Sequence, residues 1–277
     1  MNRLSTAKRA QIIGCLVEGM SIRSTVRVTG AAKNTISKLL LDLGEACSAY
    51  QDVTLRNLPT KRLEIDEMWS FVGAKAKNVP EDKKDEWGDA WTFVAIDADS
   101  KLVPSWMIGE RHTHDATIFL TDLAERLTQR VQISTDGHRM YATAVPGVFG
   151  LDVDYAMIVK YYGNDPREEK RYSPAVCTKI EKQPKIGDPD PAHISTSYVE
   201  RQNLTMRMGM RRMTRLTNAF SKKAENLAAA VSLHFMHYNF ARPHTTLSKP
   251  YATTPAMAAG VADHVWTLEE IANLLDR

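Results

Sequence analysis

The stretch Leu63-Glu64-Ile65-Asp66-Glu67-Met68-Trp69-Ser70-Phe71 places carboxylates among aliphatic and aromatic side chains. Its β-branched and aromatic residues favour a strand over a helix. Alternation along a strand puts Leu63, Ile65, Trp69 and Phe71 on one face and Asp66, Met68 and Val72 on the other. A carboxylate with apolar neighbours is costly unless it is paired, protonated or bound to metal. Two interpretations are open: a surface strand whose Asp66 and Glu67 face water, or a strand whose Asp66 is the first ligand of a catalytic metal site.

Downstream of this strand, the apolar pattern predicts an α/β unit with a second carboxylate at the end of a strand. We expect strands over residues 90–97, 102–108, 131–135 and 153–161, and helices over residues 115–130 and 139–146. Asp136 directly follows the 131–135 strand and precedes Gly137. Because α/β sheets form sites at the carboxyl ends of their strands, Asp136 is the second candidate acid.

Residues 162–197 contain five prolines among many charged side chains, and we expect a long irregular insertion there. Loops of this kind are usually functional or disordered. The basic side chains of the insertion either contact DNA or are simply solvated, and the sequence leaves both interpretations open.

A strongly basic segment follows, which we expect to form a helix from Ser197 to Lys223. From Tyr198 to Lys223 it holds seven basic residues and one acid, Glu200, which gives a net charge of +6. At 100° per residue, one side of the helix holds Met206, Met210, Met213 and Phe220, and the opposite side holds Glu200, Leu204, Arg207, Arg211 and Arg215. The alternative is a solvated basic helix whose Glu200 complements the helix dipole. Gly209 costs about 1 kcal/mol within a helix, so a break is possible there.

The first 62 residues form a basic unit of predicted helices. They hold ten Lys or Arg and four Asp or Glu, a net charge of +6, which suggests a polyanionic partner. Helices expected over residues 6–18, 22–28 and 32–43, with a turn at Thr29-Gly30-Ala31, have the helix-turn-helix layout. The start of the third helix offers side chains that suit phosphates and base edges, namely Lys33, Asn34, Thr35, Ser37 and Lys38. The alternative is a plain three-helix bundle with a solvated face.

Composition excludes several other classes of protein. The three cysteines are scattered without a CxxC pair, which predicts neither a zinc site nor a disulfide framework and fits a reducing cytosol. No apolar run approaches the length of a membrane span, and the N-terminus lacks a signal-peptide core. We therefore expect a cytoplasmic, nucleoid-associated protein with no membrane partner.

Four motifs, IDEMWSFVG, STDGHRMY, YVERQNLTMRMGMRRMTRLTNAFSKK and YNFARPHTTL, together cover most of residues 62–250. They resemble the DDE transposases of the RNase H-like and retroviral integrase superfamily, and more narrowly the transposases of the insertion-sequence-one family. The resemblance implies an α/β fold, in which a mixed five-stranded RNase H-like sheet flanked by helices is preceded by an all-α helix-turn-helix domain. Members often carry an N-terminal zinc-binding motif, which this chain lacks, so DNA binding would rest on the helix-turn-helix alone.

The resemblance also implies a site and a cofactor. Asp66, Asp136 and Glu200 would form the catalytic triad and hold Mg²⁺ or Mn²⁺, with two ions in the site. Two such ions roughly 3.5–4 Å apart can activate a water or 3′-hydroxyl and stabilise the leaving oxygen. His138 and Arg201 would orient the scissile phosphate or water, or have a structural role. DNA would contact the third helix and Arg201, Arg207, Arg211 and Arg215.

These features predict a DNA transposase that binds terminal inverted repeats, exposes 3′-hydroxyls by metal-dependent cleavage and joins them to target DNA. Its expected parts are the DNA-binding domain at residues 1–45, a linker at 46–60, the catalytic domain at 61–250 and a helical tail at 251–277. Synapsis of two ends argues for a homodimer or a larger assembly. The alternatives are an RNase H-like nuclease without strand transfer and a helix-turn-helix regulator whose large domain has decayed or binds a partner.

Overall fold

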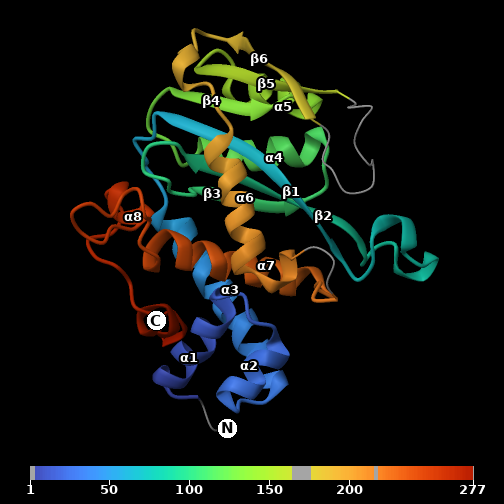
Figure 1. Ribbon diagram of the computed structural model, residues 1–277, viewed down its shortest axis with the longest axis vertical. Helices are drawn as coiled ribbons and strands as arrows, with labels where there is room; N and C mark the ends of the chain where they lie inside the picture. The colour runs from blue at the N-terminus through green and yellow to red at the C-terminus, as the bar shows by residue number, and fades with distance from the viewer. Residues whose placement is uncertain (1–3, 164–175, 215–217, 277) are drawn as a thin grey trace.

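Strand β1 (Arg62–Val72), which contains the opening stretch, lies inside the sheet of the computed structural model (Figure 1). The structure describes residues 4–163, 176–214 and 218–276. The six strands are ordered β3-β2-β1-β4-β5-β6, and only the β1–β4 and β4–β5 pairs are parallel. This mixed sheet flanked by helices confirms the predicted RNase H-like α/β class, with six strands rather than five.

The remaining strands and the helices follow the expected order closely. The strands are β2 (Gly88–Asp97), β3 (Ser105–Gly109), β4 (Val131–Asp136), β5 (Val153–Gly163) and β6 (Val176–Ile186). The helices are α1 (Thr6–Val17), α2 (Ile22–Thr29), α3 (Lys33–Thr54), α4 (Thr113–Ala124), α5 (Arg139–Phe149), α6 (Ser197–Gly209), α7 (Ala224–Met236), α8 (Pro255–Ala258) and α9 (Leu268–Asn273). Within the described ranges, no helix combines the length and the apolar character that crossing a membrane requires.

The alternating side chains of β1 contribute to two separate cores, one on each face of the sheet. Leu63 and Ile65 are buried with residues of α4 and α5. Met68 and Val72 are buried on the other face with residues of α6 and α7. A strand covered on both faces leaves its carboxylates little access to water, which excludes the interpretation of β1 as a surface strand.

A third core joins the N-terminal helices to α7 and the C-terminal tail. Helix α3 continues without a break through the boundary expected near residue 45, and its apolar face packs on α7. The tail packs on α1, where the buried Arg9 guanidinium lies 2.7 Å from a carboxylate oxygen of Asp276. In Figure 1 both chain termini lie at the end of the molecule opposite β6.

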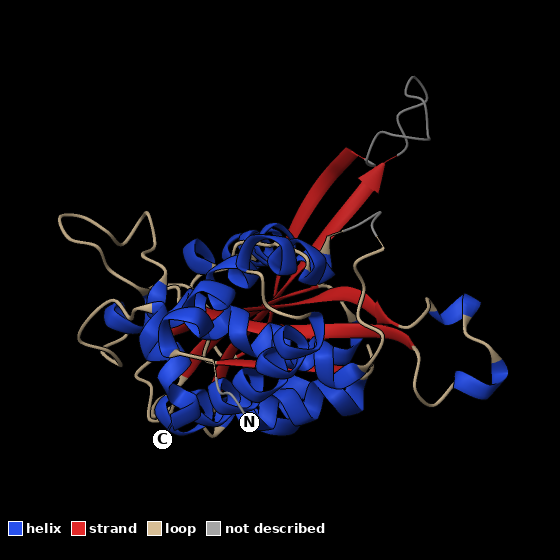
Figure 2. Cartoon of the chain, turned by 90° about the horizontal axis from the view of Figure 1, so that it is seen from below, coloured by secondary structure: helices blue, strands red, loops and turns tan. Residues whose placement is uncertain are grey.

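Two expectations about local structure are wrong. Most of the expected irregular insertion that the structure describes is ordered, because β6 pairs with β5 and forms the projecting ribbon in Figure 2. Pro184 is tolerated because β6 is an edge strand, where a missing backbone donor costs little. The helix expected from Ser197 to Lys223 ends at Gly209, and a 3₁₀ turn (Arg211–Met213) follows. Residues 164–175 and Arg215 lie outside the described part of the chain.

We predict that Gly44→Ala destabilises the protein. An added Cβ at Gly44 of α3 would lie 2.4 Å from the Cα and Cβ of Ala229 on α7, so the two helices would have to separate. Overpacking of this kind costs about 1–3 kcal/mol. The matched control is Gly147→Ala on α5, where no heavy atom lies within 4 Å of the added Cβ. Thermal melts should show a lower Tm for Gly44→Ala and an unchanged or higher Tm for Gly147→Ala; similar melts would contradict the close helix contact.

Candidate active site

Asp66 and Asp136 meet because β1 and β4 run side by side in the same direction. The parallel register pairs Ile65 with Thr135, so the next residue of each strand is an aspartate at the same edge of the sheet. Carboxylate oxygens of Asp66, Glu67 and Asp136 lie within 4.8 Å of one another. This group of three acids, found among the residues that the structure describes, has the oxygen ligands that Mg²⁺ or Mn²⁺ prefers.

Glu67 is an unexpected member of this group. Its side chain is fully buried, accepts a hydrogen bond from the Arg111 guanidinium and lies 3.0 Å from the Tyr141 hydroxyl, which donates to it. Arg111 also lies 3.5 Å from an Asp136 carboxylate oxygen and 4.6 Å from the centroid of the Trp91 ring. Arg111 thus links Glu67 to Asp136 across the edge of the sheet.

Negative charge in this group is only partly compensated. Burial, together with the neighbouring charges of Glu67 and Asp136, raises the pKa of Asp66 to about 7. Burial also raises the pKa of Glu67, an effect that Arg111 opposes. Two carboxylates about 4 Å apart repel by on the order of 4 kcal/mol at an effective dielectric of 20. A divalent cation would relieve this repulsion, so the residues fit a metal site.

Helix α6 is fixed against β1 at its N-terminus by Glu64. The Glu64 carboxylate accepts hydrogen bonds from the backbone N–H groups of Tyr198 (2.7 Å) and Val199 (3.1 Å). Backbone N–H groups in the first turn of a helix have no acceptor within that helix, and the helix dipole favours an anion at this end. One turn further on, Asn203 Nδ2 donates to Asp66 Oδ2 over 2.8 Å, so α6 contacts the acid group directly.

Glu200 lies outside the group of three acids, one turn of α6 before Asn203, which donates to Asp66. Its charge adds to those of Glu67 and Asp136 in raising the pKa of Asp66. Its carboxylate is paired with Lys160 of β5 and accepts a hydrogen bond from the Thr196 hydroxyl over 2.7 Å. In this conformation Glu200 is occupied by other partners, while Glu67 completes the group of carboxylates.

The two candidate substrate-orienting residues, His138 and Arg201, differ in position. The backbone N–H of His138 donates to Asp136 Oδ1 over 3.0 Å. The His138 imidazole accepts a hydrogen bond from the backbone N–H of Met140 at the start of α5. Burial and the Arg111 charge lower the pKa of His138. Arg201 is exposed on α6, immediately after Glu200. His138 therefore contacts Asp136 through its backbone, whereas the Arg201 side chain is exposed to solvent.

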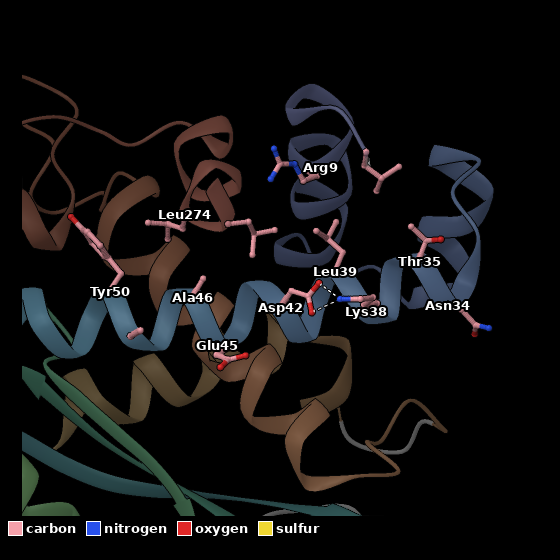
Figure 3. A pocket seen from close by; sticks show the side chains of 13 residues that line it. Arg9, Asn34, Thr35, Lys38, Leu39, Asp42, Glu45, Ala46, Tyr50 and Leu274 are labelled. Carbon is pink, nitrogen blue, oxygen red and sulfur yellow. Dashed lines mark hydrogen bonds and ion pairs between the residues drawn. The ribbon is translucent and has the colours of Figure 1, made fainter. Parts of the chain in front are cut away.

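The expected DNA-contacting residues fall in two regions. At the start of α3, Lys33, Asn34, Thr35 and Lys38 are exposed and Ser37 is half-buried. Figure 3 shows this end of α3 beside a cavity of about 1190 Å³, where Lys38 Nζ lies 2.5 Å from Asp42 Oδ2. In the second region, Arg207 is on α6 and Arg211 is exposed on the following 3₁₀ turn, so the two arginines do not continue one helix face.

Sequence reasoning missed four residues that shape this site. Glu67 alternates with Ile65 along β1, and this position on the apolar face is a signal that could have found it. Asn203 follows Glu200 by one helical turn, which is a weaker signal of the same kind. Arg111 and Lys160 come from a loop and from another strand, and no local pattern indicates either of them.

Comparison with known proteins finds no matching family model and no matching curated protein. Among solved structures, the chain resembles a chain of the simian T-cell lymphotropic virus intasome in complex with PP2A regulatory subunit B56 gamma, with a TM-score of 0.40, 16% identity, and coverage of 92% of this chain and 74% of that one. It also resembles the piggyBac transposase synaptic complex with hairpin DNA (TM-score 0.40, 11% identity, 98% and 69% coverage). The Mos1 strand transfer complex is more distant (TM-score 0.25, 12% identity, 56% and 59% coverage). At TM-scores below 0.5, these likenesses carry no conclusion about activity.

We predict that Asp66→Asn stabilises the protein increasingly as pH rises. Asp66 has a pKa of about 7 in the folded protein against 3.8 ordinarily, so between these values the folded state binds the proton more tightly and the free energy of unfolding falls with rising pH. The substitution removes this loss. We expect a Tm gain on the order of 10 °C at pH 8, because the difference between these two pKa values is worth about 4 kcal/mol and about 1 kcal/mol moves Tm by roughly 2–4 °C.

The control for this substitution is Asp85→Asn, which changes an exposed acid between β1 and β2. Its Tm should follow that of the unsubstituted protein from pH 5 to pH 8. Mg²⁺ should raise the Tm of the unsubstituted protein at pH 8 and have a smaller effect on Asp66→Asn. A difference between Asp66→Asn and the unsubstituted protein that does not change with pH would contradict the assignment of this titration to Asp66.

Proposed function

We propose that this chain is a DNA transposase of the insertion-sequence-one family, which catalyses metal-dependent 3′-end cleavage and strand transfer into target DNA. The observation that carries the proposal is the convergence of Asp66, Glu67 and Asp136 within 4.8 Å at one edge of an RNase H-like sheet. Asp66 and Glu67 have raised pKa values, so their charged forms oppose folding, and perturbed acids of this kind cluster at functional sites. The four sequence motifs supply the family and the expected role of Glu200.

The proposed metal ligands are Asp66, Asp136 and Glu200. Two bound divalent ions would activate the attacking hydroxyl and stabilise the leaving oxygen. For Glu200 to join them, its carboxylate has to leave Lys160, and Lys160 would then be free to meet a DNA phosphate. We assign Glu67 a positioning role, because its buried carboxylate holds Arg111, and Arg111 lies against Asp136.

The proposed partner is double-stranded DNA, both the terminal inverted repeats and the target. Two positively charged regions support this, the exposed start of α3 and the arginines that follow Glu200. Phosphate contacts of this kind supply affinity, whereas base contacts in the major groove supply sequence preference. Pairing of two transposon ends would require a homodimer or larger assembly.

Substitution of the acids tests the enzymatic part of the proposal. With Mg²⁺ and a duplex containing the DNA that flanks the coding region, Asp66→Asn, Asp136→Asn and Glu200→Gln should each lower cleavage more than roughly 100-fold, the upper end of the loss caused by altering outer-shell partners. Glu67→Gln should lose less, roughly 10- to 100-fold, with DNA binding intact. The control is Glu225→Gln, an exposed acid at the start of α7.

The products of the same assay separate the candidate functions. Cleavage followed by joined products identifies a transposase, cleavage without joining identifies a nuclease, and binding without cleavage identifies a regulator. If Glu67→Gln abolished cleavage while Glu200→Gln left it unchanged, Glu67 would replace Glu200 in the triad.

Charge changes on α3 test the DNA-binding part of the proposal. In the full chain, Asn34→Ala should reduce sequence preference, and Lys33→Ala should lower the slope of log affinity against log salt by about 0.9 if it removes one phosphate contact. Asp42→Asn should do the opposite and raise affinity, because it releases Lys38 from its ion pair. Glu18→Gln, an exposed acid at the end of α1, is the control for the loss of a carboxylate. Equal affinities for all four variants would contradict the assignment of α3.

A further inference from the structure

A second pocket opens beside the part of β1 that extends beyond its pairing with β4, and its volume is about 340 Å³. This lies near the lower end of the roughly 300–1,000 Å³ typical of small-molecule sites. Three aromatic residues, Trp69, Phe71 and Phe220, and three cationic residues, Lys75, Arg207 and Arg212, contribute to its wall. Its lining in the described part of the chain contains no carboxylate.

The pocket exists because β4 covers only the first part of β1. The parallel pairing of these strands ends at Ile65. Among the described residues, the next backbone contact on this side of β1 is at Val72, which forms a parallel bridge with Ser221. The Ser221 carbonyl accepts a hydrogen bond from the Gly73 N–H over 2.8 Å. Between these two points no strand pairs with this edge of β1 in the described residues, and Trp69 and Phe71 are half-buried there whereas Met68 and Ser70 are buried.

The aromatic rings form a connected and partly exposed surface in the pocket. The ring centroids of Trp69 and Phe71 are 5.7 Å apart, and those of Phe71 and Phe220 are 4.8 Å apart. All three side chains are half-buried, and the Lys75 ammonium lies 5.5 Å from the centre of the Trp69 ring. A ring face that a cation can reach is also accessible to a flat ligand.

The cations favour a phosphate-bearing ligand. Arg212 donates to the Ser221 hydroxyl over 2.9 Å, and the ion pairs among the described residues give this arginine no carboxylate partner. Aromatic faces beside arginines are the combination with which proteins hold single-stranded nucleic acid, since bases stack and phosphates pair with the cations. An apolar protein side chain would offer no anionic group to these cations.

The pocket and the candidate active site share two elements, β1 and α6. Trp69 follows Asp66 by three residues on β1, a distance of roughly 10 Å, or about three nucleotide steps of a B-form strand. Arg207 follows Asn203 by one turn of α6, and Asn203 donates to Asp66. One DNA strand could therefore contact both places.

We propose that this pocket binds an unpaired nucleobase of the DNA strand whose phosphodiester lies at Asp66 and Asp136. The inference rests on the proposed function, and it adds that the enzyme separates or unstacks bases next to the bond that it cleaves. Bases stack on Trp69 and Phe220, while Lys75, Arg207 and Arg212 hold the adjoining phosphates.

The test uses full-length protein in EDTA, so that no cleavage occurs. The probes are a 20-base-pair duplex with a three-nucleotide thymidine tail, the same duplex with an abasic tail, and a blunt duplex. We expect the thymidine tail to bind roughly 5- to 100-fold more tightly than the abasic tail, the effect expected for stacking of one base. Trp69→Leu and Phe220→Leu should remove this difference and leave the affinity for blunt duplex within twofold.

Two controls keep the test decisive. Tyr251→Leu removes a largely exposed aromatic ring outside the pocket and should retain the difference between tails. Circular dichroism and thermal melts establish that each variant folds, and Phe220→Leu, in the segment between α6 and α7, replaces Trp69→Leu if the latter unfolds. A 2-aminopurine placed in the tail should be quenched by the unsubstituted protein and not by the pocket variants.

Several results would overturn the pocket assignment. The first is equal affinity for the thymidine and abasic tails. The second is an equal loss of affinity for blunt and tailed duplexes in the pocket variants. The third is displacement of the tail by submillimolar thymidine monophosphate, which would indicate a site for free nucleotides. Because the binding assay contains no divalent ion, its outcome does not depend on whether the protein cleaves DNA. Loss of base discrimination in a protein that cleaves DNA rejects only the pocket, and base discrimination in a protein that never cleaves DNA rejects only the transposase.

Discussion

A short parallel ladder determines where the chemistry of this protein can occur. Only Arg62 to Ile65 of β1 pair with β4, yet this register fixes Asp66 beside Asp136, residues that are 70 positions apart in the chain. A slip of one residue would turn Asp66 to the opposite face of the sheet and separate the two carboxylates. The position of α6 depends on the same strand, because Glu64, two residues before Asp66, accepts the N–H groups at the start of that helix.

The acids at this edge of the sheet destabilise the fold, and their hydrogen-bond and ion-pair partners reduce this destabilisation. Arg111 contacts both Glu67 and Asp136, Lys160 contacts Glu200 and Asn203 contacts Asp66. These three partners come from a loop, a strand and a helix. Buried polar groups are costly when partly satisfied, so an arrangement of this kind is expected at a site that a ligand completes. The surrounding cores, with their buried aliphatic and aromatic side chains, supply the stability that the site lacks.

Most of the fold could be predicted from the sequence because its signals are local. Alternation and capping identify the strands and helices, and the end of the fourth strand indicates Asp136. The pairs that shape the site could not be predicted, because the partnership of Glu67 with Arg111 depends on how distant segments fold together. The edge position of β6, which tolerates Pro184, and the end of α6 at Gly209 are tertiary outcomes as well, where several local alternatives were compatible with the sequence.

Helix α3 gives the molecule a fixed internal length. Its 22 residues span about 33 Å at a rise of about 1.5 Å per residue, from an exposed start at Lys33 to an end beside the sheet. Packing of Gly44 against Ala229 prevents this rod from turning independently of α7. If its exposed start reads DNA, the same rod sets the offset between the bases that are read and the bond that is cut. A helix of this length spans about ten base pairs of B-form DNA, or one turn of the double helix.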